Sequence, residues 1–228
     1  MIDHAHDLAC VREATERLLT AVAKLDNASL AEPSRLPGWT RGHVLAHLAR
    51  NADALVNVLE GRPMYTSAEA RDADIERGAP RPLDAQLADL RESTARFQAA
   101  GDAPADWTRT VELRNGVTDS ASRLPFRRWA EVELHHVDLG IGYELEDVPA
   151  EFVEREIGFL ADRFAGHKEV PSTGLAAGDG RSWTTGGGAA GGPVAVEGTA
   201  ADLLGWLAGR RDGSRLTTNG TLPQLPPL

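Results

Sequence analysis

Cysteine is almost missing from this chain, which holds a single one, Cys10, among 228 residues. One cysteine cannot form an intramolecular disulfide or a cysteine-rich zinc cluster, and this scarcity is typical of a reducing compartment. The apolar helical neighbours of Cys10 predict a packed side chain rather than a nucleophile. No run of about 18 apolar residues occurs, so we expect no membrane span. The charged N-terminal segment lacks the apolar core of a signal peptide, and we therefore expect a cytoplasmic protein.

Basic residues are also scarce relative to acidic ones. Lysine and arginine total 24 against 34 aspartate and glutamate residues, which gives a formal net charge of -10. A chain of this charge repels phosphate backbones, so we expect no nucleic-acid partner. Within this acidic background, the adjacent arginines at 127–128 and 210–211 are candidates for binding a small anion.

Several common catalytic motifs are absent as well. The chain has no Gly-x-Ser-x-Gly sequence, P-loop, Cys-x-x-Cys pair or Gly-x-Gly-x-x-Gly sequence after a predicted strand. The glycines at 186–192 lack the lysine and the strand-to-helix context of a phosphate-binding loop, so we interpret them as a flexible loop. These absences argue against nucleotide-binding and nucleophile-elbow enzymes.

The N-terminal part contains apolar residues at helical spacing, and residues that favour the start of a helix precede several of these stretches. Thr40 and Ser67 are suited to be N-caps, and Pro125 is suited to a first helical turn. An Asn115-Gly116 pair predicts a small hairpin. The predicted helices cover residues 3–25, 40–61, 67–78, 83–101 and 125 to 140 or 142. Four of them are long and amphipathic, which predicts a helical bundle.

The composition changes after Pro149, where one further helix is followed by a glycine-rich region with short strands. Thr199 has the character of a capping residue for a last helix that Gly209 ends. The expected strands cover residues 174–177, 181–184 and 194–197, and the proline-rich end at 222–228 predicts no regular structure. We expect an α+β fold with an N-terminal four-helix bundle, residues 1–146, and a small C-terminal α+β domain, residues 147–228.

One group of residues in the predicted bundle has the composition of a metal site. Glu131 and His135 are four apart on one helix, so their side chains project from the same face. His47 lies among apolar positions of another helix, from which it could point into the same interior. Two histidines and a glutamate are ligands that catalytic zinc sites use, with one position open, and bundle interiors are where such ligands meet.

Each of these candidates has a simpler interpretation. A histidine at the edge of a helix core is commonly a hydrogen-bonded structural residue, and Glu-x-x-x-His is frequent by chance. His43 competes with His47, although its place in the first helical turn favours a capping role. His136 competes with His135 but is rotated off the face of the glutamate. Asp138 either orients a ligand or is solvated near the helix end.

Four segments of the sequence resemble those of a known family. LPGWTRGHVLAHLARNADAL, PMYTSAEARDADIERGA, RRWAEVELHHVDLGIGYELEDVP and GTAADLLGWLAGR resemble, in order and spacing, the mycothiol-dependent maleylpyruvate isomerases of the DinB-like four-helix superfamily. The resemblance implies a divalent metal, usually zinc, held by His47, Glu131 and His135, with His47 also counted as catalytic. It implies that Arg210 grips a carboxylate of the substrate. Taken alone, Arg210 would be interpreted as a cation at a helix C-terminus.

The implied reaction converts maleylpyruvate to fumarylpyruvate by reversible addition of a small thiol to the cis double bond. Mycothiol is the expected thiol, ergothioneine or another small thiol remains an alternative, and the substrate is a small carboxylate. Two other functions stay open: a metal-dependent thiol S-transferase and a non-catalytic DinB-like binding protein. The chain is expected to be a monomer or a homodimer.

Overall fold

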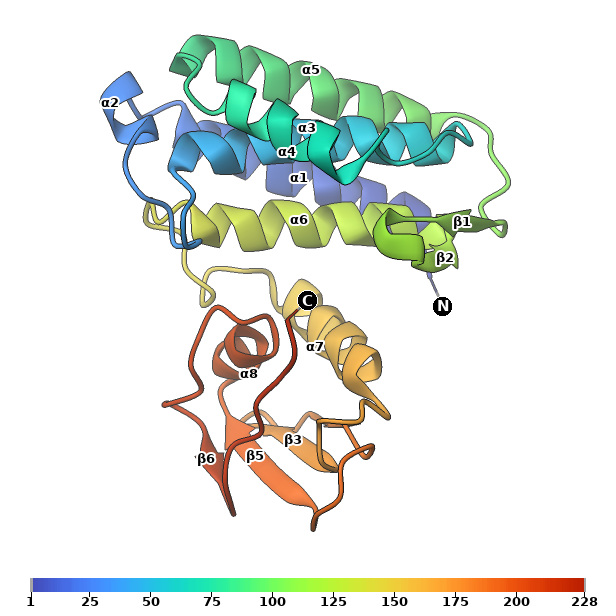
Figure 1. The fold of residues 1–228 in the computed structure, drawn as a ribbon, viewed down its shortest axis with the longest axis vertical. Helices are drawn as coiled ribbons and strands as arrows, with labels where there is room; N and C mark the ends of the chain where they lie inside the picture. Colours follow the sequence, from blue (N-terminus) through green and yellow to red (C-terminus); the bar gives the residue numbers. More distant parts are fainter. Residues whose placement is uncertain (1, 228) are drawn as a thin grey trace. The chain divides into compact units, whose positions relative to one another are not determined.

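Eight α-helices and six short strands form the described part of the chain, residues 2–227, in the computed structural model (Figure 1). The chain divides into two units, Met1–Tyr143 and Glu144–Leu228, and the four-stranded sheet belongs to the second. The predicted α+β fold is confirmed, whereas the boundary expected between residues 146 and 147 stays a prediction. No helix within residues 2–227 is long and apolar enough to cross a membrane.

Four long helices make up the bundle of the N-terminal unit, and Figure 1 shows them running side by side. They are α1 (His4–Val22), α3 (Arg41–Leu59), α5 (Leu83–Asp102) and α6 (Leu124–Asp138). The main packing pairs are α3 with α5 and α1 with α6, and α3 also packs against α6. Two shorter helices, α2 (Asn27–Leu30) and α4 (Ala68–Gly78), complete the unit, with α4 against α3.

The helix starts follow from capping side chains. Thr40 and Ser67 accept hydrogen bonds from backbone amides three residues on, as the sequence predicts. Helix α1 ends at Val22, whereas the sequence predicted a helix as far as residue 25. The separate short helix α2 follows, with Asp26 as its N-cap. The bundle buries large apolar side chains, and each fully buried one stabilises the fold by about 1.5–3 kcal/mol. Among them are Leu18, Leu48, Leu90, Phe97 and Leu124.

The predicted hairpin is present between α5 and α6. Strands β1 (Thr110–Glu112) and β2 (Thr118–Ser120) pair antiparallel, joined by a short 3₁₀ turn, η1 (Arg114–Gly116). Asn115 has φ 61° and Gly116 has φ 72°, both left-handed. Asparagine and glycine tolerate this region better than other residues, which is why the pair signals a hairpin. A second 3₁₀ turn, η2 (Ala121–Arg123), leads into α6.

The C-terminal unit combines two helices with a mixed sheet. Its elements are α7 (Ala150–Phe164), β3 (Thr173–Ala177), β4 (Ser182–Thr185), β5 (Val194–Gly198), α8 (Ala200–Leu207) and β6 (Thr217–Thr218). The strand order is β4-β3-β5-β6, with β3 and β5 parallel and the other pairs antiparallel. Helix α7 packs on α8 and β4. Strand β6 was not predicted, since two residues carry no recognisable alternation.

Candidate metal centre

Packing of α3 on α6 brings together the three residues expected as metal ligands. Nε2 of His47 lies 2.9 Å from Oε2 of Glu131, and Nε2 of His135 lies 3.2 Å from the same oxygen. The three ligand atoms all lie within 4.8 Å of one another. The two imidazole rings are 4.7 Å apart between centroids and cross at 81°. His47, Glu131 and His135, the triad, therefore converge from two helices on one point.

The triad is open on its carboxylate side. The side chains of His47 and His135 are 7% and 12% exposed, whereas that of Glu131 is 32% exposed. The imidazoles are thus shielded from water while the carboxylate is accessible. A bound ion would be held from the protein side and would keep a face for a further ligand, as catalytic metal sites require.

Burial and hydrogen bonding set the charges of the triad. Burial lowers the pKa of His47 to about 4, and the hydrogen bond with Glu131 offsets only part of this effect. Burial opposes ionisation of Glu131, but hydrogen bonds from His135 and His47 hold the pKa of this carboxyl well below its usual range. At neutral pH the site therefore presents a neutral imidazole of His47 beside an ionised carboxylate, both suited to a cation.

His135 is oriented by a second carboxylate. Its Nδ1 lies 2.9 Å from Oδ2 of Asp138, and the Asp138 side chain is fully buried. Burial favours the neutral ring, but the hydrogen bonds with Asp138 and Glu131 outweigh it and raise the pKa of His135. A proton held at Nδ1 by Asp138 leaves Nε2 directed at the triad, the arrangement found behind metal-ligating histidines. The donor set fits a divalent metal such as zinc.

The competing histidines lie outside the triad. Nδ1 of His43 accepts a hydrogen bond from the backbone amide of Thr40 at 3.2 Å, which completes a capping box at the start of α3. His136 is buried and stacks on Tyr143, with ring centroids 4.0 Å apart. Cys10, expected to be packed, is instead partly exposed, and its sulfur lies 3.5 Å from Nε2 of His6.

The two arginines of the pair on α6 have different protein partners. Arg128 is fully buried, and its Nη1 donates to the backbone oxygen of Leu48 and to Oδ1 of Asn51, both at 2.8 Å. Arg127 pairs with Asp119 at 2.7 Å. Arg128 therefore links α6 to α3, and Arg127 neutralises a carboxylate of the hairpin.

Sequence reasoning missed Arg71, which α4 places next to the triad. Its Nη2 lies 3.4 Å from Nδ1 of His47, and its guanidinium lies 5.9 Å from the ring centroid of Tyr65. Its Nη1 pairs with Asp72 at 2.7 Å. The one signal available beforehand was its place inside the family-like segment PMYTSAEARDADIERGA, which carries no spacing related to the histidines. Trp39 was missed as well, and its ring lies 5.4 Å from that of His47.

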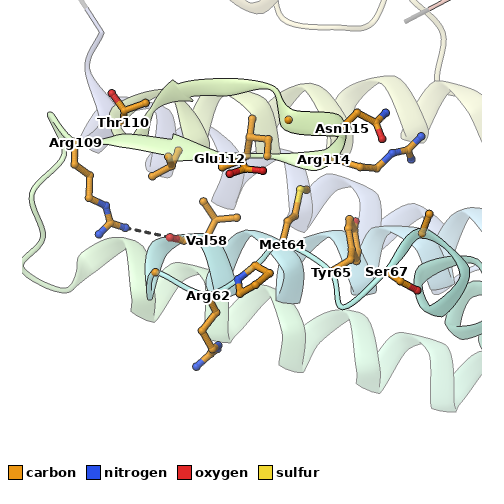
Figure 2. A pocket seen from close by; sticks show the side chains of 16 residues that line it. Val58, Arg62, Met64, Tyr65, Ser67, Arg109, Thr110, Glu112, Arg114 and Asn115 are labelled. Carbon is orange, nitrogen blue, oxygen red and sulfur yellow. Dashed lines mark hydrogen bonds between the residues drawn. The ribbon is translucent and has the colours of Figure 1, made fainter.

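Tyr65 also lines a groove. It has a volume of about 630 Å³ and lies between residues 58–68 and the β1–β2 hairpin. Figure 2 shows Met64 and Tyr65 pointing toward the hairpin and Arg62 pointing away from it. Arg109 crosses one end and donates to the backbone oxygen of Val58 at 3.1 Å. Burial and the nearby charge of Glu131 raise the pKa of Tyr65, so its phenol stays neutral at the groove wall.

Two family models match the chain. The mycothiol maleylpyruvate isomerase N-terminal domain matches residues 11–140, and the MDMPI C-terminal domain matches residues 147–227. This chain belongs to the mycothiol maleylpyruvate isomerase family.

Two solved structures agree with membership of this family. One is the crystal structure of the mycothiol-dependent maleylpyruvate isomerase, and the other is a histidine-to-alanine mutant of the mycothiol-dependent maleylpyruvate isomerase. Each is 28% identical, has a TM-score of 0.89, and is aligned over 99% of this chain and 97% of its own. No curated protein sequence matches the chain.

Within this member of the mycothiol maleylpyruvate isomerase family, Arg210 belongs to the C-terminal unit. It follows α8, and its Nη1 donates to the backbone oxygen of Ala208 at 2.7 Å. It lines a cavity of about 290 Å³ together with Arg211, which pairs with Asp202 at 2.5 Å and with Glu146 at 2.7 Å. The contact with Ala208 matches the simpler interpretation of Arg210 as a cation at a helix C-terminus. The catalytic role of Arg210 stays a prediction.

Proposed function

We propose that this chain is a metal-dependent and thiol-dependent cis–trans isomerase that converts maleylpyruvate to fumarylpyruvate. The observation that carries the proposal is the convergence of His47, Glu131 and His135 within 4.8 Å, in a chain that both domain models of the family match. A cytoplasmic location belongs to the proposal, because a thiol cofactor and a single cysteine suit a reducing compartment.

His47, Glu131 and His135 would hold the metal, for which zinc is the proposed ion, and mycothiol is the proposed thiol. A divalent metal bound there would lower the pKa of a small thiol and so favour the nucleophilic thiolate near neutral pH. The chain supplies the negative charge of Glu131 and a His135 ring oriented by Asp138 at 2.9 Å. Burial of both imidazoles limits the water that would otherwise compete for the site.

The thiolate adds to the cis double bond, whose conjugated carbonyl takes up the electron pair as an enolate. The new single bond allows rotation, and collapse of the enolate expels the thiolate and leaves the trans double bond. The thiol must come from outside the chain, because Cys10 is its one cysteine and lies beside His6 rather than in the triad. Arg210 is the proposed partner of a substrate carboxylate, since a guanidinium matches carboxylate geometry.

Turnover of maleylpyruvate by the zinc-loaded protein tests the proposal. The assay follows fumarylpyruvate formation and free thiol concentration with mycothiol, ergothioneine and glutathione, each with and without a chelator. We expect turnover that needs both metal and thiol and leaves the thiol concentration unchanged. Stoichiometric loss of thiol would indicate an S-transferase instead, and a metal-loaded protein inactive with every thiol would indicate a binding protein.

Ligand variants test which residues hold the metal. We expect Glu131→Ala and His135→Ala each to lower bound zinc and activity together, because each removes one of three ligands. His43→Ala is the matched control, since His43 caps α3 at Thr40 and should leave the zinc content unchanged. Zinc measured by mass spectrometry at the wild-type level in both ligand variants would show that the metal lies elsewhere.

A further inference from the structure

The two histidines of the triad differ in what faces their second ring nitrogen. Nδ1 of His135 faces Asp138, a carboxylate that accepts a hydrogen bond, at 2.9 Å. Nδ1 of His47 faces Nη2 of Arg71 at 3.4 Å. A guanidinium has N–H donors and no acceptor. The contact of His47 with Arg71 is therefore favourable only while Nδ1 of His47 carries no proton.

Metal ligation by His47 would reverse this contact. With Nδ1 unprotonated, Nε2 carries the proton and donates to Oε2 of Glu131 at 2.9 Å, which agrees with the distances in the site. A neutral imidazole that ligates a metal through Nε2 carries its proton on Nδ1 instead. Two N–H groups would then point at each other, one from His47 and one from Arg71. The guanidinium has to turn away from the ring when the metal site is formed.

The ion pair of Arg71 is weak, so it does not fix the guanidinium in its present direction. Its carboxylate partner within the described residues, Asp72, is 67% exposed, and exposed ion pairs contribute little. Its own side chain is 14% exposed and lies over the ring of Tyr65, with the guanidinium carbon 5.9 Å from the centroid. A planar, mostly shielded guanidinium beside a cation site is suited to bind a carboxylate through two parallel hydrogen bonds.

We propose that Arg71, released from His47 when the metal site forms, binds a carboxylate of the ligand at the triad. The inference rests on the proposed function, whose substrate is a dicarboxylate. Tyr65, over whose ring the Arg71 guanidinium lies, is also one of the residues that line the groove between residues 58–68 and the β1–β2 hairpin (Figure 2). The groove, about 630 Å³ in volume, is therefore linked to Arg71 through this shared residue, and a cation held by the triad would supply the anchoring charge.

Maleate, a small dicarboxylate, is the probe for this site in the zinc-loaded, full-length protein. Isothermal titration calorimetry compares the wild type with Arg71→Met, and chelator competition measures zinc affinity in parallel. We expect Arg71→Met to weaken maleate binding by about tenfold or more while zinc affinity is unchanged or increased, because a competing contact with His47 is removed. Arg71→Lys should recover part of the maleate affinity, because it restores charge without the planar fork.

Arg77→Met is the matched control. Arg77 lies on the same helix, is 73% exposed and pairs with Asp74, so its loss should change neither maleate nor zinc binding. Unchanged maleate affinity in Arg71→Met, or no maleate binding by the wild type, would overturn the inference. A tenfold loss of zinc affinity in Arg71→Met would also overturn it, since Arg71 would then support His47.

The binding measurement does not depend on turnover, which separates the two proposals. Arg71-dependent maleate binding by a protein that isomerises nothing would leave the inference intact and refute the proposed function. Thiol-dependent turnover, together with maleate binding that does not depend on Arg71, would refute the inference and leave the proposed function intact.

Discussion

His135 is held from two sides, by Glu131 at Nε2 and by Asp138 at Nδ1, and both partners lie on its own helix. Spacings of three and four residues on α6 make these contacts local, so sequence spacing predicts them. His47 is different, because its neighbours Glu131 and Arg71 come from other helices. Of these contacts, only those within one helix follow from the order of the residues.

The carboxylate behind His135 is open to a direct test. Asp138→Asn keeps the size of the side chain but removes its charge, so the imidazole should become a poorer and less well-oriented ligand. We expect zinc affinity to fall by about 10–100-fold, measured by chelator competition. Asp162→Asn, at an exposed position of α7, is the control and should bind zinc like the wild type. Equal affinities for the two variants would show that Asp138 does not orient the ligand.

Zinc binding should weaken as the pH falls. The pKa of His135 is raised, despite burial, by its hydrogen bonds with Asp138 and Glu131, so this ring must release a proton before it ligates. Below that pKa, affinity should drop by about tenfold per pH unit. His47, with a pKa of about 4, is already neutral and adds no further loss until the pH is far more acidic.

Chelator competition at several pH values measures this dependence, and calorimetry counts the protons released. In Asp138→Asn the pKa of His135 should be lower, because a charged acceptor is lost, so the steep region should move to lower pH. Affinity that stays constant from neutral to mildly acidic pH would contradict the assignment of His135 as a ligand that is protonated before binding.

Helix α4 carries Arg71 but is attached to the bundle by few buried residues. Within α4 only Ile75 and Gly78 are buried, and its main contacts are with α3. The two helices approach closely at Gly42, where an added Cβ would lie 2.2 Å from the backbone oxygen of Ala79. At the element scale, the position of α4, and with it that of Arg71, depends on a glycine of α3.

Gly42→Ala should therefore destabilise the protein, because the new methyl group forces α3 and α4 apart. We expect a loss of about 1–3 kcal/mol in the free energy of unfolding, measured by urea denaturation. The matched control is Gly158→Ala in α7, where the added Cβ would meet Trp183 at an ordinary 3.7 Å. Alanine there should stabilise by up to about 1 kcal/mol, since it is the better helix former. Equal effects at both positions would argue against tight α3–α4 packing.

The proposed functional residues are divided between the two units of the whole molecule. The triad belongs to the N-terminal unit and Arg210 to the C-terminal unit. Metal binding and the carboxylate contact proposed for Arg210 can therefore be separated by mutation. Arg210→Ala should leave the zinc content at the wild-type level and lower kcat/KM for maleylpyruvate, because a charged contact with the substrate is lost.

Steady-state kinetics and zinc analysis of the same preparation measure both effects. Arg163→Ala, at an exposed position of α7, is the control for removal of a positive charge from the C-terminal unit. Wild-type kinetics in Arg210→Ala would remove its assigned role, and a loss of zinc would show that it acts on the metal site instead.

Residue spacing and capping residues are enough to predict the four long helices, the caps at Thr40 and Ser67, the hairpin at Asn115, and the shared face of Glu131 and His135. These features depend on backbone dihedral preferences and hydrogen bonds between residues a few positions apart. Helix packing, in contrast, is what brings His47 to Glu131 across 84 positions, lowers the pKa of His47 by burial, and places Arg71 beside its ring. Those contacts depend on how apolar faces of separate helices pack together, which no local spacing records.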